Sequence, residues 1–418
     1  MDIFIGVIVG LLVLMALVTA HEFGHFIMAR RNGVRVLEFG IGFPPRAIAW
    51  VKDTETKKWK KIPKKDWKKE QNDLIFSLNW LPIGGFCQMD GESAEDDRKG
   101  TFGKASFWAK TKILFGGVAM NWLVAFIVFT ILAWTGMPEF LDGQFTIPAD
   151  TRIDATPVQV AEVVEGSPAK KSGVRENDYI LAIDGIEMWN ASEITDYNES
   201  HAGEKVIYTI KKEPNTACDP DCKECDCIND IEGKTRDLAV TLNPAGSEYL
   251  LGVTMKTSQA LSYSTWSAPV VGAGLTVQLT GETFKGVGIM IWNLVSGIGS
   301  QFSPDANIRE NGQEAISSVG DSVSGPVGII GVLFPAFTSA GPTNLVFLAA
   351  LISVSLACMN VLPIPALDGG RWLLIAIYKL RKKKLTKEVE EKIVSRAFMV
   401  LLALIFIVTI LDIIRIAN

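Results

Sequence analysis

The stretch His21-Glu22-Phe23-Gly24-His25 directly follows an uncharged run from Ile3 to Ala20. That run has the length and composition of a membrane-spanning helix. Residues i and i+4 share one helix face, so the two imidazoles can bind one Zn²⁺. The glutamate between them is the usual general base for the attacking water. The pattern therefore predicts hydrolytic zinc chemistry at membrane depth.

A chance match is the alternative reading of these five residues. On a soluble helix, two histidines at this spacing are often ordinary surface residues. Here His21, Glu22 and His25 stand at the end of an apolar span. Ionisable side chains are costly in that position and indicate a functional site by default. A plain membrane anchor would not need them.

A second motif ends the uncharged run from Leu345 to Leu367, and it reads Asn360-Val361-Leu362-Pro363-Ile364-Pro365-Ala366-Leu367-Asp368-Gly369-Gly370. Pro363 and Pro365 would break the helix and free backbone amides and carbonyls. Membrane proteins tolerate such backbone only where it lines a protein cavity. Beside this break, the Asn360 amide is expected to bind the substrate backbone or to orient the site.

Asp368 is the best candidate for a third zinc ligand. A catalytic zinc site takes three protein ligands and a water. The chain has only three histidines, and His201 lies in a different predicted domain. The alternative is a charged helix end in the membrane interface, which the flanking Pro-x-Pro and Gly-Gly make less attractive.

Together the two motifs resemble those of the site-2 protease family of intramembrane metalloproteases, in the arrangement of the bacterial RseP type. Three further stretches are similar to family segments, namely Phe39–Pro44, Pro82–Glu92 and Ser324–Ile329. The resemblance implies Zn²⁺ held by His21, His25 and Asp368, with Glu22 as the base.

The resemblance also implies roles for residues outside the zinc motif. Alternating apolar and small residues over 74–92 predict a β-hairpin around Gly84 and Gly85. In the family this hairpin presents a strand edge to the substrate, and strand addition would hold the scissile backbone extended. Asn121 lies within the second span, where its amide serves either helix packing or, as the resemblance implies, support of the active-site region.

Mean hydropathy is positive at +0.24, although 21% of the residues are charged. We therefore expect a polytopic α-helical membrane protein with about four transmembrane helices, a cytoplasmic-side membrane β-hairpin and one extracytoplasmic PDZ (α+β) domain. The predicted parts are span one at 1–30, a cytoplasmic loop with the hairpin at 31–110, span two at 111–136, the PDZ domain at 143–259, an interfacial amphipathic segment at 260–342, span three at 343–378, a cytoplasmic loop at 379–395 and span four at 396–418.

The orientation follows from basic residues near the span ends. Residues 50–70 hold nine Lys against four Asp or Glu, and residues 379–384 contain five further Lys or Arg. Both loops are therefore predicted to be cytoplasmic. The Lys- and Trp-rich stretch 57–69 suits a solvated loop near anionic headgroups better than nucleic-acid binding.

The segment from Gly166 to Gly185 resembles a bacterial PDZ domain, with a short helix after Ser-Pro-Ala and a strand ending in Asp-Gly. The resemblance implies a size filter above the active site. A Cys-rich insertion at 213–235 separates two predicted strands of this domain. Its four cysteines are expected to form two disulfides or, as the runner-up, a second metal site, and they are Cys218, Cys222, Cys225 and Cys227.

These observations predict a zinc-dependent intramembrane endopeptidase of the cell membrane. By resemblance its substrates are single-span membrane proteins such as anti-sigma factors or remnant signal peptides. The lipid bilayer is the other expected partner, nucleic acid is not expected, and the sequence leaves the oligomeric state open. The main alternative is a proteolytically inactive, PDZ-bearing membrane adaptor. A zinc transporter is a third possibility, but it would need polar ligands in more than two spans.

Overall fold

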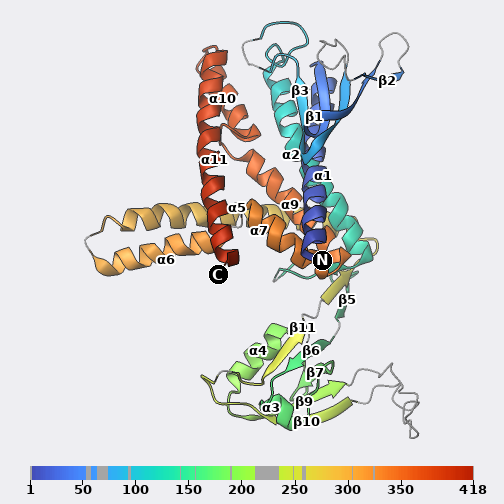
Figure 1. Cartoon of the computed structure of the whole chain (residues 1–418), viewed down its shortest axis with the longest axis vertical. Coiled ribbons are helices and arrows are strands. Elements are labelled where there is room, and N and C mark those ends of the chain that lie inside the picture. Colours follow the sequence, from blue (N-terminus) through green and yellow to red (C-terminus); the bar gives the residue numbers. More distant parts are fainter. Residues whose placement is uncertain are drawn as a thin grey trace. The chain divides into compact units, whose positions relative to one another are not determined.

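The computed structural model describes residues 2–52, 58–63, 74–92, 96–141, 143–155, 157–188, 191–211, 235–247, 249–256, 260–303, 305–322 and 325–417. The chain forms two compact units (Figure 1). The helical unit comprises Met1–Thr135, Phe145–Ile147 and Trp266–Asn418, and the β unit comprises Gly136–Gln144 and Pro148–Thr265.

Four helices in the described part of the chain are long and apolar enough to cross a membrane. They are α1 (Asp2–Arg31), α2 (Phe107–Thr135), α9 (Pro342–Val361) and α11 (Lys387–Ala417). The four predicted spans are thus present as helices. Two boundaries differ, because α2 begins inside the predicted loop 31–110 and α11 begins inside the predicted loop 379–395.

The predicted break after the third span is present. Helix α9 ends at Val361, and α10 (Asp368–Leu380) begins at the aspartate of the second motif. The two glycines that follow Asp368 allow this arrangement. A Cβ at Gly369 would lie 2.1 Å from the carbonyl oxygen of Val361, and one at Gly370 would lie 2.0 Å from that of Ile364. Larger residues would push the first turn of α10 away from the broken segment.

Helices α1 and α2 approach each other through glycine. A Cβ at Gly24 would lie 2.1 Å from the carbonyl oxygen of Gly116, and a Cβ at Gly116 would lie 2.8 Å from the carbonyl oxygen of Gly24. Small residues at a helix crossing in a membrane let the backbones come into contact. This crossing falls within the His-Glu-Phe-Gly-His stretch, so it sets the distance between that stretch and α2.

The sheet of the helical unit differs from the predicted hairpin. It contains β1 (Val36–Lys52), β2 (Trp59–Lys61) and β3 (Ile75–Met89). Residues 38–41 of β1 pair with residues 85–88 of β3 on one side and with residues 75–78 on the other. The prediction that residues 74–92 form a hairpin by themselves is therefore wrong, because part of β1 lies between the two halves of β3.

This sheet is held in place by a bent β1 and by contact with α1. Residues 75–78 also pair with residues 48–51, so both β1 and β3 contribute twice to the sheet. The Arg46 guanidinium binds the buried Glu38 carboxylate across the bend, with 2.9 Å between Nε and Oε1. At the end nearest the histidines, a Cβ at Gly85 would lie 3.1 Å from the Thr19 hydroxyl of α1.

The segment 260–342, which was predicted to be interfacial and amphipathic, contains a long uninterrupted helix. Helix α5 (Ala268–Ser300) is continuous, and α6 (Ala306–Ser322) packs against it. Gly272 of α5 allows close packing, because a Cβ at this position would lie 2.4 Å from the Thr130 hydroxyl of α2. Figure 1 shows α5 and α6 crossing the direction of α1 and α11. Their interfacial role stays a prediction.

The short helices α7 (Pro326–Gly328), η3 (Ile329–Leu333) and α8 (Phe334–Ser339) connect α11 to α1. The buried carboxylate of Asp412 in α11 accepts hydrogen bonds from the backbone N–H groups of Gly325 and Gly328, at 3.1 and 2.8 Å. At the other end, a Cβ on Gly6 of α1 would lie 2.4 Å from Cα of Pro335. The described part of the third stretch with family resemblance, residues 325–329, therefore contacts α11, and the helix α8 that follows contacts α1.

The β unit has its own core and two sheets. The larger sheet has the order β10-β9-β7-β6-β11, with β8 beside β7, and the smaller has the order β4-β12-β5. The strands are β4 (Met137–Pro138), β5 (Arg152–Ala155), β6 (Val158–Val163), β7 (Tyr179–Ile183), β8 (Ile186–Glu187), β9 (Lys205–Lys211), β10 (Thr235–Thr241), β11 (Val253–Lys256) and β12 (Ala260–Tyr263).

Local features of the β unit match the sequence signals. Ser167 accepts a hydrogen bond from the N–H of Lys170 and so caps α3 (Pro168–Ser172). Asp184 and Gly185 both have positive φ in the turn between β7 and β8. A second helix, α4 (Ala191–Ser200), follows. The identification as a PDZ domain stays a prediction, and the Cys-rich insertion with its four cysteines lies outside the described residues.

The α1–α2 crossing yields the first testable prediction. Gly24→Ala should lower the free energy of unfolding by about 1–3 kcal/mol, because the added methyl overlaps the Gly116 carbonyl and overpacked sites cost that much. Gly281→Ala in α5 is the matched control, since nothing lies within 4 Å of its Cβ position. Denaturant unfolding of both variants in detergent, followed by tryptophan fluorescence, measures the difference. Equal stability of the two variants would contradict the close crossing.

Candidate metal centre

Three side chains converge on one point in the helical unit. The Nε2 atom of His21 lies 3.0 Å from Oδ2 of Asp368 and 3.1 Å from Nε2 of His25. The Nε2 atom of His25 lies 3.3 Å from the same Oδ2. Both histidines are 7% exposed. The structure thus brings together the two ends of the sequence pattern, which stand 347 residues apart.

The backbone explains how these side chains meet. His21 and His25 are one helical turn apart on α1, so their rings leave the same face. Asp368 is the first residue of α10, directly after the broken segment. Had α9 continued as a helix through this region, the carboxylate would follow a different axis. The break therefore turns Asp368 toward the imidazoles.

The donor set and its spacing fit zinc. Four-coordinate Zn²⁺ binds imidazole nitrogen and carboxylate oxygen at about 2.0–2.2 Å, which places neighbouring ligand atoms about 3.3–3.5 Å apart in a tetrahedron. The three separations observed here are close to that spacing. With three protein ligands, one position stays open for water or substrate, as in catalytic zinc sites.

Gly117 of α2 leaves room for the ligand atoms. A Cβ at this position would lie 2.6 Å from Nε2 of His21 and 2.7 Å from Nε2 of His25. Any other residue would therefore occupy the space in which the ligand atoms meet. Gly117 was not singled out from the sequence. Its position four residues before Asn121, on the same helix face, is the signal that indicates a shared role.

Groups behind the ligands orient the two imidazoles. The Nδ1 atom of His25 lies 2.8 Å from the backbone carbonyl oxygen of Ile113 in α2. The Nδ1 atom of His21 lies 3.4 Å from the side-chain Nδ2 of Asn121, also in α2. Second partners of this kind fix the ring orientation and the tautomer of metal-binding histidines. Neither Ile113 nor its carbonyl could be singled out from sequence.

Glu22 stands beside the three ligands without being one of them. It is partly buried and interacts electrostatically with His21, His25 and Asp368. The backbone of Cys87 in β3 also interacts with its carboxylate, which places Glu22 next to the sheet edge. Burial, together with the Glu22 and Glu92 carboxylates, raises the pKa of the Cys87 thiol to about 12. Cys87 is therefore a neutral thiol at pH 7 and no thiolate ligand.

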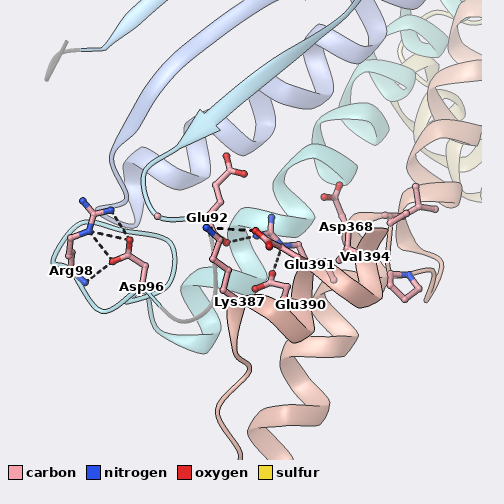
Figure 2. Close-up of a pocket in the computed structure, with 13 residues that line it drawn as sticks. Glu92, Asp96, Arg98, Asp368, Lys387, Glu390, Glu391 and Val394 are labelled. Carbon is pink, nitrogen blue, oxygen red and sulfur yellow. Dashed lines mark hydrogen bonds and ion pairs between the residues drawn. The ribbon is translucent and has the colours of Figure 1, made fainter. Parts of the chain in front are cut away.

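A cavity of about 840 Å³ opens beside Asp368 (Figure 2). Its lining is mostly charged and includes Glu92, Arg371 and Glu390. Arg371 donates from Nε to Oε1 of Glu390 in α11 at 3.1 Å and from its terminal nitrogen to the backbone carbonyl of Glu92. It thus ties α10 to α11 and to the segment after β3. Sequence reasoning missed Arg371, although its place three residues after Asp368 puts it on the same helix face.

The structure also places the other predicted site residues, which lie in α9, in the segment after it and in β3. The Asn360 amide donates to the carbonyl of Leu356 within α9, at 3.0 Å, so its donor is engaged locally. Pro365 lines the charged cavity. A Cβ at Gly84 would lie 3.1 Å from Val18 of α1. Pro363 belongs to the broken segment between α9 and α10.

His201, the third histidine, belongs to the β unit. Its ring stacks on Tyr197 with 4.1 Å between ring centroids. Within the described residues, His21, His25 and Asp368 are the group of His, Cys, Asp and Glu side chains placed to hold a metal ion.

Comparison with known proteins agrees with this geometry. A Clostridium perfringens protein named as a candidate zinc metalloprotease is 29% identical over 414 residues, which cover 98% of both chains. The regulator of sigma-W protease RasP of Bacillus subtilis is 23% identical over 495 residues, covering 99% of both chains. The chloroplastic membrane metalloprotease ARASP of Arabidopsis thaliana is 26% identical, covering 96% of this chain and 77% of that relative.

The family model for peptidase family M50 matches residues 9–62 and 55–405. This match includes both zinc-site motifs and most of the chain between them. It also agrees with the four apolar helices and with the two histidines and one carboxylate that meet between them. The chain therefore belongs to peptidase family M50, the site-2 protease family, and is a membrane metalloprotease.

Proposed function

We propose that this protein is a zinc-dependent intramembrane endopeptidase that cleaves single-span membrane proteins. The observation that carries the proposal is the meeting of His21 and His25, within the apolar helix α1, with Asp368, which begins the helix after the apolar helix α9. From Ile3 to His21 an α-helix rises about 27 Å, which nearly crosses a hydrocarbon core of about 30 Å. The site then lies near the cytoplasmic side of that core.

His21, His25 and Asp368 would hold the zinc ion. Zinc bound there supplies a Lewis acid that activates water and polarises the scissile carbonyl. Glu22, partly buried beside the ligands, accepts the proton of the attacking water and delivers it to the leaving amine. Its contact with the backbone of Cys87 keeps the carboxylate turned toward the substrate side of the site. Gly117 contributes by keeping α2 out of the space between the ligand atoms.

Substrate binding involves the sheet edge and the broken helix. Within the part of the chain that the structure describes, residues 85–88 pair with β1 on one side only, and they adjoin Glu22 through Cys87. A substrate strand added near Gly84 and Gly85 would lie extended beside the base, which is the conformation that peptide hydrolysis needs. Asn360, Pro363 and Pro365 would position the substrate from the other side, where the helix is interrupted between Val361 and Asp368.

The β unit would act as the extracytoplasmic PDZ domain that filters substrates by size. We propose a multi-pass protein of the inner cell membrane, with residues 50–70 in the cytoplasm. The name of one relative contains the words regulator of sigma-W, which favours an anti-sigma factor trimmed on its outer side as the substrate. A remnant signal peptide is the alternative, because it too is a single apolar segment. Asn121 supports the zinc site, and the four clustered cysteines stay a predicted disulfide or metal cluster.

Two variants separate the roles of base and ligand. Glu22→Gln should retain zinc and lose cleavage of a single-span model substrate, because both imidazoles remain while the base is gone. Asp368→Asn should lose zinc as well, since a neutral amide is a poorer ligand than a carboxylate. Zinc content and cleavage are measured on the same purified samples. Normal cleavage by Glu22→Gln would sink the mechanism, and a wild-type protein that binds zinc without cleaving anything would favour an adaptor.

The orientation can be tested by labelling. In a background whose native cysteines are replaced by Ser, a reagent that cannot cross membranes should label Glu187→Cys from outside intact cells. It should label Lys60→Cys only after the cells are opened. Both positions are exposed, so access depends on the side of the membrane alone. The opposite pattern would overturn the proposed topology.

The filter role can be tested by shortening the β unit. Ala155 of β5 pairs directly with Ala260 of β12, so a two-residue turn can join them and replace residues 156–259 while β4, β5 and β12 keep their pairing. This variant should cut a substrate with a bulky outer domain as readily as a trimmed one. Full-length protein should cut only the trimmed substrate. If the shortened enzyme cuts the trimmed substrate and still rejects the bulky one, the β unit is not the filter.

A further inference from the structure

We propose that Asn121 selects the zinc-binding tautomer of His21, accepting a hydrogen bond from Nδ1–H through an amide whose Oδ1, not its Nδ2, faces the ring. This inference rests on the zinc site of the proposed function. It assigns to a buried amide in α2 a defined positioning task, beyond general support of the site. Three independent observations lead to it.

The first observation is the direction of the His21 ring. Its Nε2 atom points at the meeting place of the ligands, 3.0 Å from Asp368 and 3.1 Å from His25. A ring nitrogen that binds a metal offers its lone pair and carries no proton. The proton of a neutral imidazole must then reside on Nδ1, which makes Nδ1 a hydrogen-bond donor. His21 therefore needs an acceptor behind it.

The second observation is a donor–acceptor mismatch at that position. The atom facing Nδ1 of His21 is Nδ2 of Asn121, at 3.4 Å. An amide nitrogen only donates, so this orientation suits the opposite tautomer, with the proton on Nε2. Meanwhile Oδ1 of the fully buried Asn121 has no hydrogen-bond partner among the described residues. A half-turn about the Cβ–Cγ bond exchanges the two atoms and presents the missing acceptor.

The balance of hydrogen bonds favours this exchange once His21 binds zinc. In either orientation one atom of the Asn121 amide lacks a protein partner. The exchanged orientation replaces two facing donors by a hydrogen bond to a metal ligand. A buried donor left without an acceptor costs about 1–3 kcal/mol. Because Asn121 is 0% exposed, bulk solvent does not supply that acceptor.

The third observation is the matching partner of the other histidine. The Nδ1 atom of His25 lies 2.8 Å from the carbonyl oxygen of Ile113, which can only accept. Ile113, Gly117 and Asn121 recur every four residues along one face of α2. The face thus offers an acceptor, a gap for the ligand atoms and then the Asn121 amide. With an acceptor at Asn121, both histidines would donate a hydrogen bond from Nδ1–H to α2 and offer the lone pair of Nε2 to the metal.

A backbone hydrogen bond fixes the position of Asn121 relative to α9. Its carbonyl oxygen accepts a hydrogen bond from the buried Ser353 hydroxyl of α9, at 2.9 Å. This contact fixes α2 against the helix that leads to Asp368. The side chain of Asn121 is therefore placed by the same two helices that bring the ligands together.

Zinc affinity of full-length variants in detergent tests the proposal. Removing both amide functions in Asn121→Leu should weaken zinc binding about 10–100-fold, the usual effect of losing a group that orients a metal ligand. Asn121→Asp keeps an oxygen acceptor and loses the donor, so it should bind zinc at least as tightly as wild type. Asn344→Leu, which removes a buried amide near the other end of α9, is the control and should keep wild-type affinity. Competition with a chromophoric chelator gives the constants.

The outcomes distinguish the possible roles. If Asn121→Asp binds zinc as poorly as Asn121→Leu, the amide acts as a donor and the proposal is overturned. Wild-type affinity in Asn121→Leu would overturn it too. Failure of the wild-type protein to bind zinc would instead sink the proposed function.

A second measurement needs no variant. With only three histidines in the chain, long-range proton–nitrogen spectra of histidine-labelled, zinc-loaded protein can be assigned. The proton of His21 is expected on Nδ1, and a proton on Nε2 would contradict the tautomer assignment.

Discussion

The zinc site depends on how closely α1 and α2 can approach each other. At Gly24 and Gly116 the two backbones are in contact, and one residue further along α2 the absent side chain of Gly117 leaves space for two imidazoles. This closeness does two things at once. It brings the Ile113 carbonyl and the Asn121 side-chain amide of α2 within reach of the Nδ1 atoms of the two histidines. It also buries the ionisable side chains of the site within the protein, where they avoid the cost of contact with lipid. Separating the helices by one methyl group would affect both.

The second requirement is the interruption between α9 and α10. A regular helix would continue along the axis of α9, whereas the segment with Pro363 and Pro365 ends that helix. It also starts a new helix whose first residue, Asp368, points at the histidines. Arg371, on the same face, then anchors the new helix to α11 and to the segment after β3. The position of one carboxylate is thus set by three elements.

Sequence patterns predicted the parts of this protein that local chemistry controls. The four long apolar helices, the helix break and the meeting of both motifs all follow from hydropathy, proline and metal-ligand spacing. The prediction for residues 74–92 was wrong, because period-two alternation shows that strands exist but not which strands lie side by side. The segment 260–342 was predicted only to be interfacial and amphipathic, and its pattern did not show that Gly272 of α5 packs against α2. Gly117 and Arg371 were missed, although their spacing places them on the helix faces of Asn121 and Asp368. Ile113 could not be singled out, since the role of its carbonyl arises only when distant segments meet.

The small sheet at the base of the β unit has a consequence for how this chain can evolve. The strands that enter and leave the unit, β4 and β12, pair with each other, and β5 closes the sheet. The two chain segments that connect the β unit to the helical unit therefore lie next to each other, hydrogen-bonded as neighbouring strands. Insertions between neighbouring chain positions are the ones that folded proteins accept most readily. Lineages can lengthen, duplicate or exchange the unit as a module, while the helices that carry the metal ligands keep their register.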